Sequence, residues 1–268
     1  MGQPSIPPRT LPDALLAEGV TWITTNEIAT RLGIRPDQVP DSLERSRAAG
    51  RVLSITKGAW LVVSPEYLSW GAPPPEHYVD AWMHHLGHAY YVGLLTAAAR
   101  HGFTHHAPQV FHVVTTARLR DRTIGRSRIA FVYAKHCSER LTVSSTVPTG
   151  KLVLSSLAVT LLDLVAYPDR SGGPSNVASI AALALEDGRL DVHTLVASAA
   201  TYRGPVVQRL GFLVERAAAH IGSTIDLAPL ARLVERRTVV PLDTRSDATG
   251  GIDGRWQVLM NVDVEIDA

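Results

Sequence analysis

One segment of the chain, TARLRDRTIGRSRIAFVY (residues 116–133), concentrates positive charge. Its arginines are Arg118, Arg120, Arg122, Arg126 and Arg128, in a chain of 268 residues whose formal net charge is only +1. A guanidinium group presents a planar fork of N–H donors that matches the oxygens of phosphate or carboxylate in pairs. The segment therefore indicates a surface that contacts nucleic-acid phosphate or an acidic protein partner. The alternative is a solvated basic face that Asp121 and the acidic C-terminal region partly balance.

The charge of the whole chain is distributed unevenly. Residues 1–70 carry seven basic and seven acidic side chains, and residues 71–151 carry nine basic and four acidic ones. Residues 152–268 carry ten basic and fourteen acidic side chains. The sequence thus has a cationic middle and an anionic end, and the arginine segment lies in the cationic part.

Histidine and cysteine offer little sign of metal or catalytic chemistry. The pairs His84/His88 and His101/His105 have i, i+4 spacing, but a zinc site needs three or four convergent ligands. The stretch HHLGH lacks the glutamate of an HExxH motif, and Gly87 weakens the helix. Cys137 is the single cysteine, so neither an internal disulfide nor a cysteine-cluster zinc site can form. No serine-hydrolase elbow or phosphate-binding P-loop pattern occurs. We therefore expect no metal, no cofactor and no catalytic residues, that is, a protein that is not an enzyme.

The first 70 residues predict a winged helix-turn-helix domain that follows a disordered lead over residues 1–9. Apolar spacing and glycine stops give three helices, and the last two are separated by a turn. Thr25 is expected to cap the second helix, and the regular part of the third is expected to begin near Val39, with Val39, Leu43 and Ser46 toward the core. Two apolar runs around Lys57 and Gly58 then predict a hairpin.

The outward face of the third predicted helix carries side chains that can read DNA. Gln38, Ser42 and Arg45 share this face, and glutamine and arginine can bond adenine and guanine in pairs of hydrogen bonds. Asp41 and Glu44 near this face, and the zero net charge of residues 1–70, count against DNA. An ordinary polar surface, or a module that binds protein, is the alternative. The predicted DNA contacts are Thr24, Thr25, Asn26, Arg35, Gln38, Ser42, Arg45, Arg51 and Lys57.

The remainder of the chain predicts a mixed α/β region, and the fold class is α+β. A proline-rich linker is expected over residues 71–76, and the C-terminal region then covers residues 77–268, with a subdivision near residue 150. Residues 76–103 are expected to be helical with a break near Gly87. Two apolar runs that flank the arginine segment predict a basic β-hairpin with the arginines on its arm and tip. Several helices and a closing strand at residues 255–267 are expected to follow.

Several stretches together resemble the AbiEi family, the antitoxin and repressor half of AbiE (type IV) toxin–antitoxin systems. They are, in chain order, AYYVGLLTAAARHGF, QVFHVVTT, SSLAVTLLDLVAYPDRSGG, YRGPVVQRLGFLVE and GRWQVLMNVDVE. The order and spacing of these stretches carry the resemblance, which covers nearly the whole chain and is nearest to actinobacterial members. The resemblance implies an N-terminal winged helix that binds inverted repeats in the promoter of its own operon. It also implies a C-terminal region that counteracts a cognate nucleotidyltransferase toxin, directly or functionally.

Three functions remain open at this point. The first is an autorepressor and antitoxin whose partners are double-stranded DNA and the toxin. The second is a winged-helix transcription regulator whose C-terminal domain senses a small ligand, and the third is a nuclease with a DNA-targeting arm. The sequence contains no apolar run near the ~18 residues that a membrane-spanning helix needs, and the N-terminus lacks the pattern of a signal peptide. We therefore expect a cytoplasmic protein without membrane contact.

Overall fold

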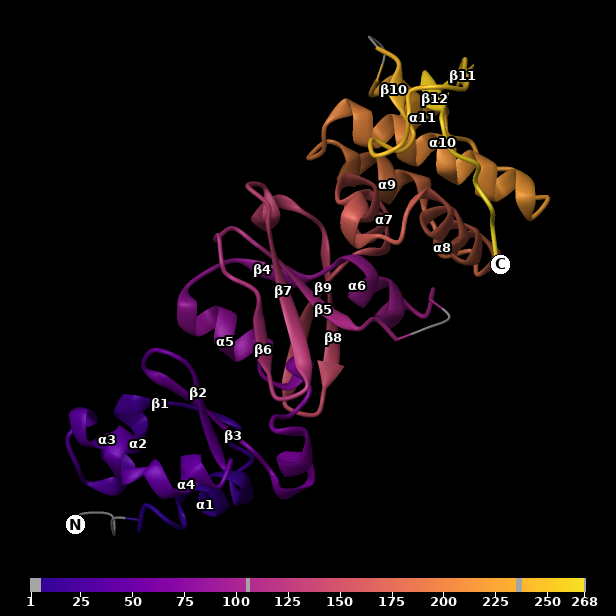
Figure 1. Cartoon of the computed structure of the whole chain (residues 1–268). Coiled ribbons are helices and arrows are strands. Elements are labelled where there is room, and N and C mark those ends of the chain that lie inside the picture. The colour runs from indigo at the N-terminus through magenta and orange to yellow at the C-terminus, as the bar shows by residue number, and fades with distance from the viewer. Residues whose placement is uncertain (1–5, 105–106, 235–237, 268) are drawn as a thin grey trace.

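The computed structural model describes residues 6–104, 107–234 and 238–267. Figure 1 shows three parts that follow one another along the length of the molecule: an N-terminal unit, a six-stranded sheet with helices beside it, and a C-terminal group of helices. The architecture is a mixture of helices and sheets, as the α+β prediction requires. In the described part of the chain, no helix is both long enough and apolar enough to span a bilayer.

The N-terminal unit combines four α-helices with a small antiparallel sheet in the strand order β1-β3-β2. Its elements are α1 (Leu11–Ala17), β1 (Trp22–Thr24), α2 (Thr25–Leu32), η1 (Pro36–Gln38), α3 (Val39–Ser42), α4 (Glu44–Ala48), β2 (Val52–Thr56) and β3 (Ala59–Val62). The inward faces of these elements share one hydrophobic core. Ile6 donates its backbone N–H to the carbonyl of Arg31, so residues 6–9 of the predicted lead adjoin this unit, whereas residues 1–5 lie outside the described residues.

The ends of the helices in this unit differ from the prediction in two places. Thr24, not Thr25, caps α2: its backbone is extended, and it exchanges hydrogen bonds with Glu27 in a capping box. The third predicted helix is bent into α3 and α4 at Leu43, where ψ is 2°. Backbone hydrogen bonds that Leu43 accepts from Arg47 and donates to Val39 continue through the bend. The predicted inward positions Val39, Leu43 and Ser46 are all buried.

Residues 76–103 are not one interrupted helix. The chain forms η2 (Pro65–Trp70), η3 (Pro75–His77), α5 (Val79–Leu86), β4 (Tyr90–Val92) and α6 (Leu94–His101). The helical prediction for Tyr90–Val92 is therefore wrong: aromatic and β-branched side chains favour a pleated strand, and β4 lies inside the six-stranded sheet. Gly87 ends α5 in the left-handed conformation, and a side chain on Gly93 would collide with Val114 of the neighbouring strand.

The large sheet has the strand order β6-β7-β5-β4-β9-β8. Its remaining strands are β5 (Val110–Thr115), β6 (Arg122–Ile124), β7 (Ser127–Tyr133), β8 (Thr142–Val147) and β9 (Gly150–Ser155), with η4 (Cys137–Glu139) before β8. Strands β5 and β7 run parallel, and β6 is the antiparallel edge strand beside β7. Side chains of alternate residues in β7 enter two different cores: Ile129 and Phe131 pack with α5, and Val132 packs with the core that includes α6 and α7.

The predicted linker packs against the β6–β7 turn. Arg126 donates its backbone N–H to the carbonyl of Trp70 over 3.0 Å, and Gly71 lies directly against Gly125. A Cβ on Gly125 would lie 2.5 Å from the Trp70 carbonyl oxygen, so these two segments of the backbone approach at a distance that only glycine permits. This contact joins the segment after the N-terminal unit to the edge of the large sheet.

The C-terminal part is a helical layer with a small sheet of order β10-β12-β11. Its elements are α7 (Leu157–Ala166), η5 (Pro168–Arg170), α8 (Pro174–Glu186), α9 (Val192–Ala199), α10 (Gly204–His220), α11 (Ala228–Arg232), β10 (Val240–Pro241), β11 (Gly251–Asp253) and β12 (Val258–Met260). The closing strand predicted over residues 255–267 is observed only as β12, and β12 pairs with β11 over three residues. Trp256 is fully buried against Gly211 of α10 and donates its indole N–H to Glu215 over 2.6 Å.

A buried ion pair joins the sheet to the helical layer. Asp163 of α7 is fully buried and accepts hydrogen bonds from Arg140, from Tyr91 of β4 and from Tyr202 after α9. The distances are 2.8, 2.8 and 2.7 Å respectively. The Arg140 guanidinium also stacks over the Tyr202 ring at 4.2 Å from its centroid. One carboxylate thus holds groups from three separate segments of the chain.

Candidate nucleic-acid interface

The face predicted to read DNA is only partly open. Gln38 and Arg45 are exposed, and Ser42 is half-buried. The Gln38 side-chain oxygen accepts the backbone N–H of Arg35 over 3.0 Å, which leaves its amide nitrogen as the group that faces outward. Arg45 has no ion-pair partner among the described residues. The base-reading candidates are therefore Gln38, at the end of η1 directly before α3, and Arg45 in α4; Figure 1 shows where α3 and α4 lie in the N-terminal unit.

Two of the predicted phosphate contacts are already neutralised within the unit. Arg35 forms two hydrogen bonds with the carboxylate of Asp37, at 3.0 and 2.9 Å, on an exposed surface. Arg51 pairs with Asp13, and only 22% of the Arg51 side chain is exposed. Lys57 stands at the exposed turn of the β2–β3 hairpin, where its carbonyl contacts His85 of α5. Of these three basic groups, Lys57 is the one without a paired carboxylate in the described residues.

The N-terminus of α2 is occupied by the protein's own carboxylate. Glu27 accepts hydrogen bonds from the backbone N–H and the hydroxyl of Thr24, at 2.8 and 2.7 Å, and these bonds lower the pKa of Glu27. Thr25 accepts the indole N–H of Trp60 over 3.0 Å. Of the three residues predicted to meet phosphate here, Asn26 alone has an exposed side chain that makes no hydrogen bond within the described residues.

The two apolar runs that flank the arginine segment do not form a hairpin with the arginines on its arm and tip, so this prediction is wrong. Since β5 and β7 are parallel, the hairpin is β6–β7, and Arg118 and Arg120 lie on the connection that precedes it. Arg118 stacks over Tyr133 at 4.4 Å from the ring centroid, whereas Arg126 in the hairpin turn lies 5.8 Å from the centroid of Trp70.

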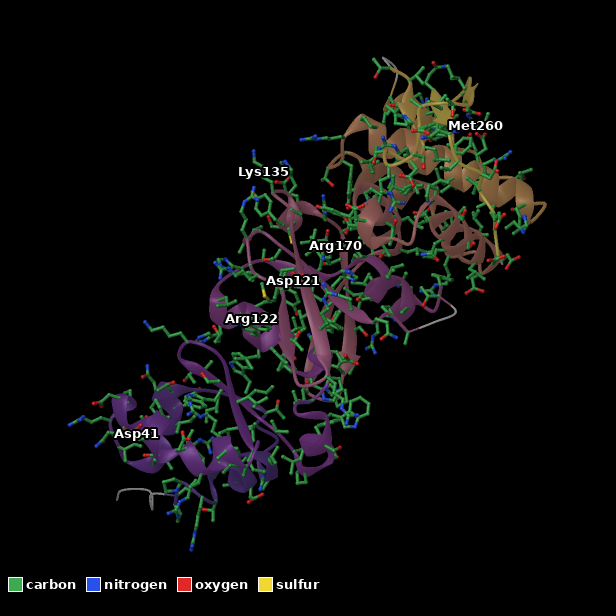
Figure 2. All side chains as sticks on the ribbon, in the orientation of Figure 1. Asp41, Asp121, Arg122, Lys135, Arg170 and Met260 are labelled. Atoms are coloured by element: carbon green, nitrogen blue, oxygen red, sulfur yellow. The ribbon has the colours of Figure 1, made fainter. Side chains whose placement is uncertain are left out.

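The two arginines on the hairpin strands point to opposite faces of the sheet. Arg128 pairs with Thr123, so these two side chains lie on the same face of the sheet. Arg122 is next to Thr123 in β6, so its side chain lies on the opposite face. Figure 2 places Arg122 on the sheet, while Asp41 marks α3 at the far end of the molecule. Arg120 and Arg122 are exposed and have no carboxylate partner in the described part of the chain.

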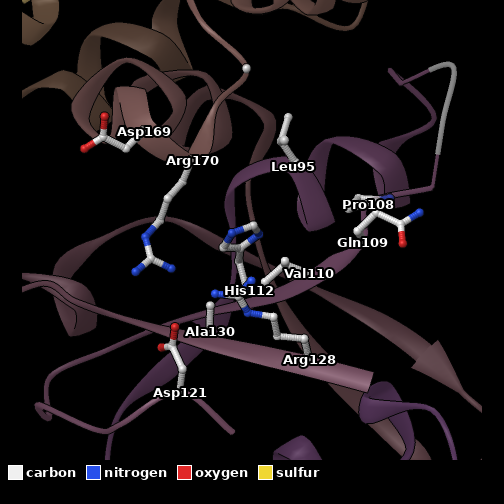
Figure 3. A pocket seen from close by; sticks show the side chains of 11 residues that line it. Leu95, Pro108, Gln109, Val110, His112, Asp121, Arg128, Ala130, Asp169 and Arg170 are labelled. Carbon is white, nitrogen blue, oxygen red and sulfur yellow. The ribbon is translucent and has the colours of Figure 1, made fainter. Parts of the chain in front are cut away.

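Arg128 lines a cavity of about 570 Å³ on the α6 side of the sheet. Figure 3 shows that the Arg128 side chain points toward His112 of β5 and that the Arg170 side chain of η5 points toward Asp121. His112 is 6% exposed, and burial, with Arg170 and Arg128 nearby, lowers its pKa to about 4. Sequence reasoning missed His112 and Arg170, because only the pairing of β5 with β7 and the packing of η5 above them bring these residues together.

The other residues tested for chemistry are engaged in structure. His84 contacts Asp80 of its own helix, and His101 donates its Nε2–H to the carbonyl of Ser155 over 2.8 Å. His105 lies outside the described residues. Burial raises the pKa of the Cys137 thiol to about 12, which opposes its use as a nucleophile at neutral pH. No three histidine, cysteine or acidic side chains converge as metal ligands in the ranges that the structure describes.

Fold and site together define an α+β protein with a small helical N-terminal unit and a basic sheet region. Residues 91–216 match the model of the AbiEi antitoxin C-terminal domain, which supports an AbiEi-type antitoxin domain in this part of the chain. The chain is also similar in fold to the RV2827C protein from Mycobacterium tuberculosis, with a TM-score of 0.66 and 14% identity over 96% of this chain and 93% of that one. No curated protein matches the chain significantly.

Proposed function

We propose that this antitoxin binds the promoter of its own operon through the N-terminal unit, represses that operon, and counteracts a cognate toxin of the nucleotidyltransferase class. The proposal rests chiefly on the antitoxin domain at residues 91–216, which follows a separate N-terminal unit with an exposed reading face. Catalysis by the chain itself is not part of the proposal.

The N-terminal unit has the element order of a winged helix-turn-helix. In that reading α2 is the first helix of the motif, the bent pair α3 and α4 is the recognition helix, and the β2–β3 hairpin is the wing. Gln38 and Arg45 then face the major groove, and Lys57 at the wing tip meets a phosphate. Asn26 at the start of α2 supplies a further polar contact.

The basic middle region is proposed to extend the contact with DNA. Arg35 and Arg51 are paired with carboxylates, so the N-terminal unit offers few free cations to phosphate. Arg120 and Arg122 offer unpaired guanidinium groups outside that unit, and each phosphate contact adds to both affinity and salt dependence. The competing possibility is that these two arginines contact the toxin.

The proposal is tested by measuring the affinity of the chain for its upstream DNA between about 50 and about 200 mM salt, where counterion release is strong. Replacing Arg120 and Arg122 by alanine should flatten the slope of log K against log salt by up to roughly 0.9 per lost phosphate contact. Arg45→Ala should weaken specific binding by about 1–3 kcal/mol while non-specific binding changes little. Arg232→Ala, at an exposed position on α11, is the matched control and should change neither quantity.

Freeing a cation tests the same idea in the opposite direction. Asp37→Ala removes the carboxylate that holds Arg35, and it should strengthen DNA binding and steepen the salt slope. A chain that ignores its promoter DNA at low salt would overturn the proposal. If the Arg120/Arg122 variant keeps its slope but no longer protects cells that express the toxin, the basic region belongs to the antitoxin surface instead.

A further inference from the structure

The cavity that Arg128 lines is walled by several separate segments of the chain. His112, Val110 and Ala130 form its floor on β5 and β7, and Leu95 of α6 and Arg170 of η5 form its sides. Its volume of about 570 Å³ falls in the range of sites for small molecules, which is roughly 300–1,000 Å³. It lies on the face of the sheet opposite to Arg122, so it is distinct from the exposed arginines proposed to meet DNA.

Two arginines and two carboxylates line this cavity: Arg128 and Arg170, together with Asp121 and Asp169. No acidic group lies within ion-pair distance of Arg128 or Arg170 among the described residues, although Asp169 beside Arg170 pairs with Arg245 at 3.8 Å. Asp121 also lines the cavity, and one of its oxygens accepts the backbone N–H of Phe131 over 3.0 Å. The second Asp121 oxygen has no hydrogen-bond donor in the described part of the chain.

His112 adds an acceptor to the same wall. Thr96 donates its hydroxyl proton to the carbonyl of Val110 over 3.1 Å and accepts the backbone N–H of His112 over 2.9 Å, so one lone pair of its oxygen remains. The Nδ1 atom of His112 lies 3.5 Å from that oxygen, a contact that favours the proton on Nδ1. Because the low pKa of the ring keeps it neutral at pH 7, Nε2 remains an acceptor, and no partner for it occurs in the described residues.

We propose that this cavity binds a small phosphorylated sugar of the nucleoside monophosphate class, with its phosphate between Arg128 and Arg170 and its hydroxyl groups on Asp121 and His112. Guanidinium forks bind phosphate oxygens in pairs, whereas a carboxylate oxygen and a neutral imidazole nitrogen accept from hydroxyl groups. Inorganic phosphate would use only the first half of the site. The proposal does not rest on DNA binding, and it gives the antitoxin a ligand of its own.

The test is calorimetric titration of the full-length chain with AMP, GMP, ribose 5-phosphate and inorganic phosphate. The phosphorylated sugars should bind more tightly than inorganic phosphate. Arg170→Ala should weaken all four at least tenfold, which corresponds to about 1.4 kcal/mol. Asp121→Asn should weaken the sugar phosphates and leave inorganic phosphate nearly unchanged. Arg120→Ala removes an equal charge outside the cavity and is the matched control.

The outcomes separate this inference from the proposed function. Arg170→Ala should leave the salt slope of DNA binding intact, and circular dichroism should confirm that it folds like the parent chain. Equal affinity for inorganic phosphate and ribose 5-phosphate would overturn the sugar part of the proposal. An equal loss of affinity in Arg120→Ala would mean that a general charge effect, and not the cavity, binds the probes. If none of the four probes gives a heat of binding, the proposed site is wrong, whatever the result with DNA.

Discussion

Replacing Asp163 by asparagine should destabilise the chain more than its small change in size suggests. The substitution keeps the shape of the side chain but removes the negative charge that faces Arg140, whose side chain is 7% exposed. A buried charge that loses its partner destabilises a fold by about 3–5 kcal/mol, and single domains have a total stability of about 5–15 kcal/mol. Tyr202→Phe removes one hydrogen bond to the same carboxylate and should destabilise by about 1.5–3 kcal/mol.

The double variant Arg140→Met, Asp163→Leu removes both charges together. It should be close to the parent in stability, or within a few kcal/mol of it, because neither an unpaired charge nor a large cavity is left behind. The assay is urea unfolding followed by both far-ultraviolet circular dichroism and tryptophan fluorescence, since agreement of the two signals tests for a single transition. A matched control is Arg255→Met, which breaks the half-exposed pair with Glu215 and should change stability by about 1 kcal/mol or less.

The result that refutes this reasoning is an Asp163→Asn variant within 1 kcal/mol of the parent, or a double-variant cycle that shows no coupling, since a buried pair in contact should give about 0.5–3 kcal/mol. A second result would contradict a structural role for Asp163. If the variant is fully folded and still loses both DNA binding and protection from the toxin, the carboxylate acts in function and not only in holding the sheet to α7.

Two further predictions concern packing and pH. Gly211→Ala should destabilise by about 1–3 kcal/mol or more, measured by urea unfolding, because the new Cβ overlaps the buried ring of Trp256; Gly204→Ala, where a Cβ has room, is its control. The folded-state pKa of His112 is about 4, below the 6.5 of an unperturbed histidine, so the neutral ring stabilises the fold above pH 6.5 and this stability is lost as pH falls toward 4. At about 1.4 kcal/mol per pKa unit, the stability advantage of the parent over His112→Gln should shrink by about 3 kcal/mol between pH 7 and pH 4, and a constant difference would refute it.

Local signals in the sequence predicted the parts of the fold that depend on neighbours along the chain. Gly33 and Gly50 end helical segments, and the Lys57–Gly58 turn reverses the chain between two strands, as periodicity and turn chemistry indicate. The same signals misread Tyr90–Val92, because the segment is short, apolar and flanked by helices. Its pairing with β5 and β9 involves residues far along the chain, which no local pattern contains.

The placement of the arginines shows the same limit at the candidate site. Residue types and spacing identify Arg122 and Arg128 as basic, and alternation along a strand would separate them if the register were known. The register depends on the parallel pairing of β7 with β5, and this pairing depends on how the sheet packs against α5 and α6. Arg170 joins the cavity only through the position of η5, so no motif in the sequence links it to His112.

The distribution of carboxylates explains why the two basic regions have different roles in the proposed function. In the N-terminal unit, Asp37 and Asp13 pair with Arg35 and Arg51, so the reading face can discriminate bases without a strong general attraction to phosphate. In the sheet region, exposed arginines such as Arg122 lack such partners and supply attraction without base contacts. We therefore predict that either region alone binds DNA weakly. Under the proposed function, specific and salt-dependent binding requires both regions on one duplex, which the contact of the linker with the β6–β7 turn favours by holding them together.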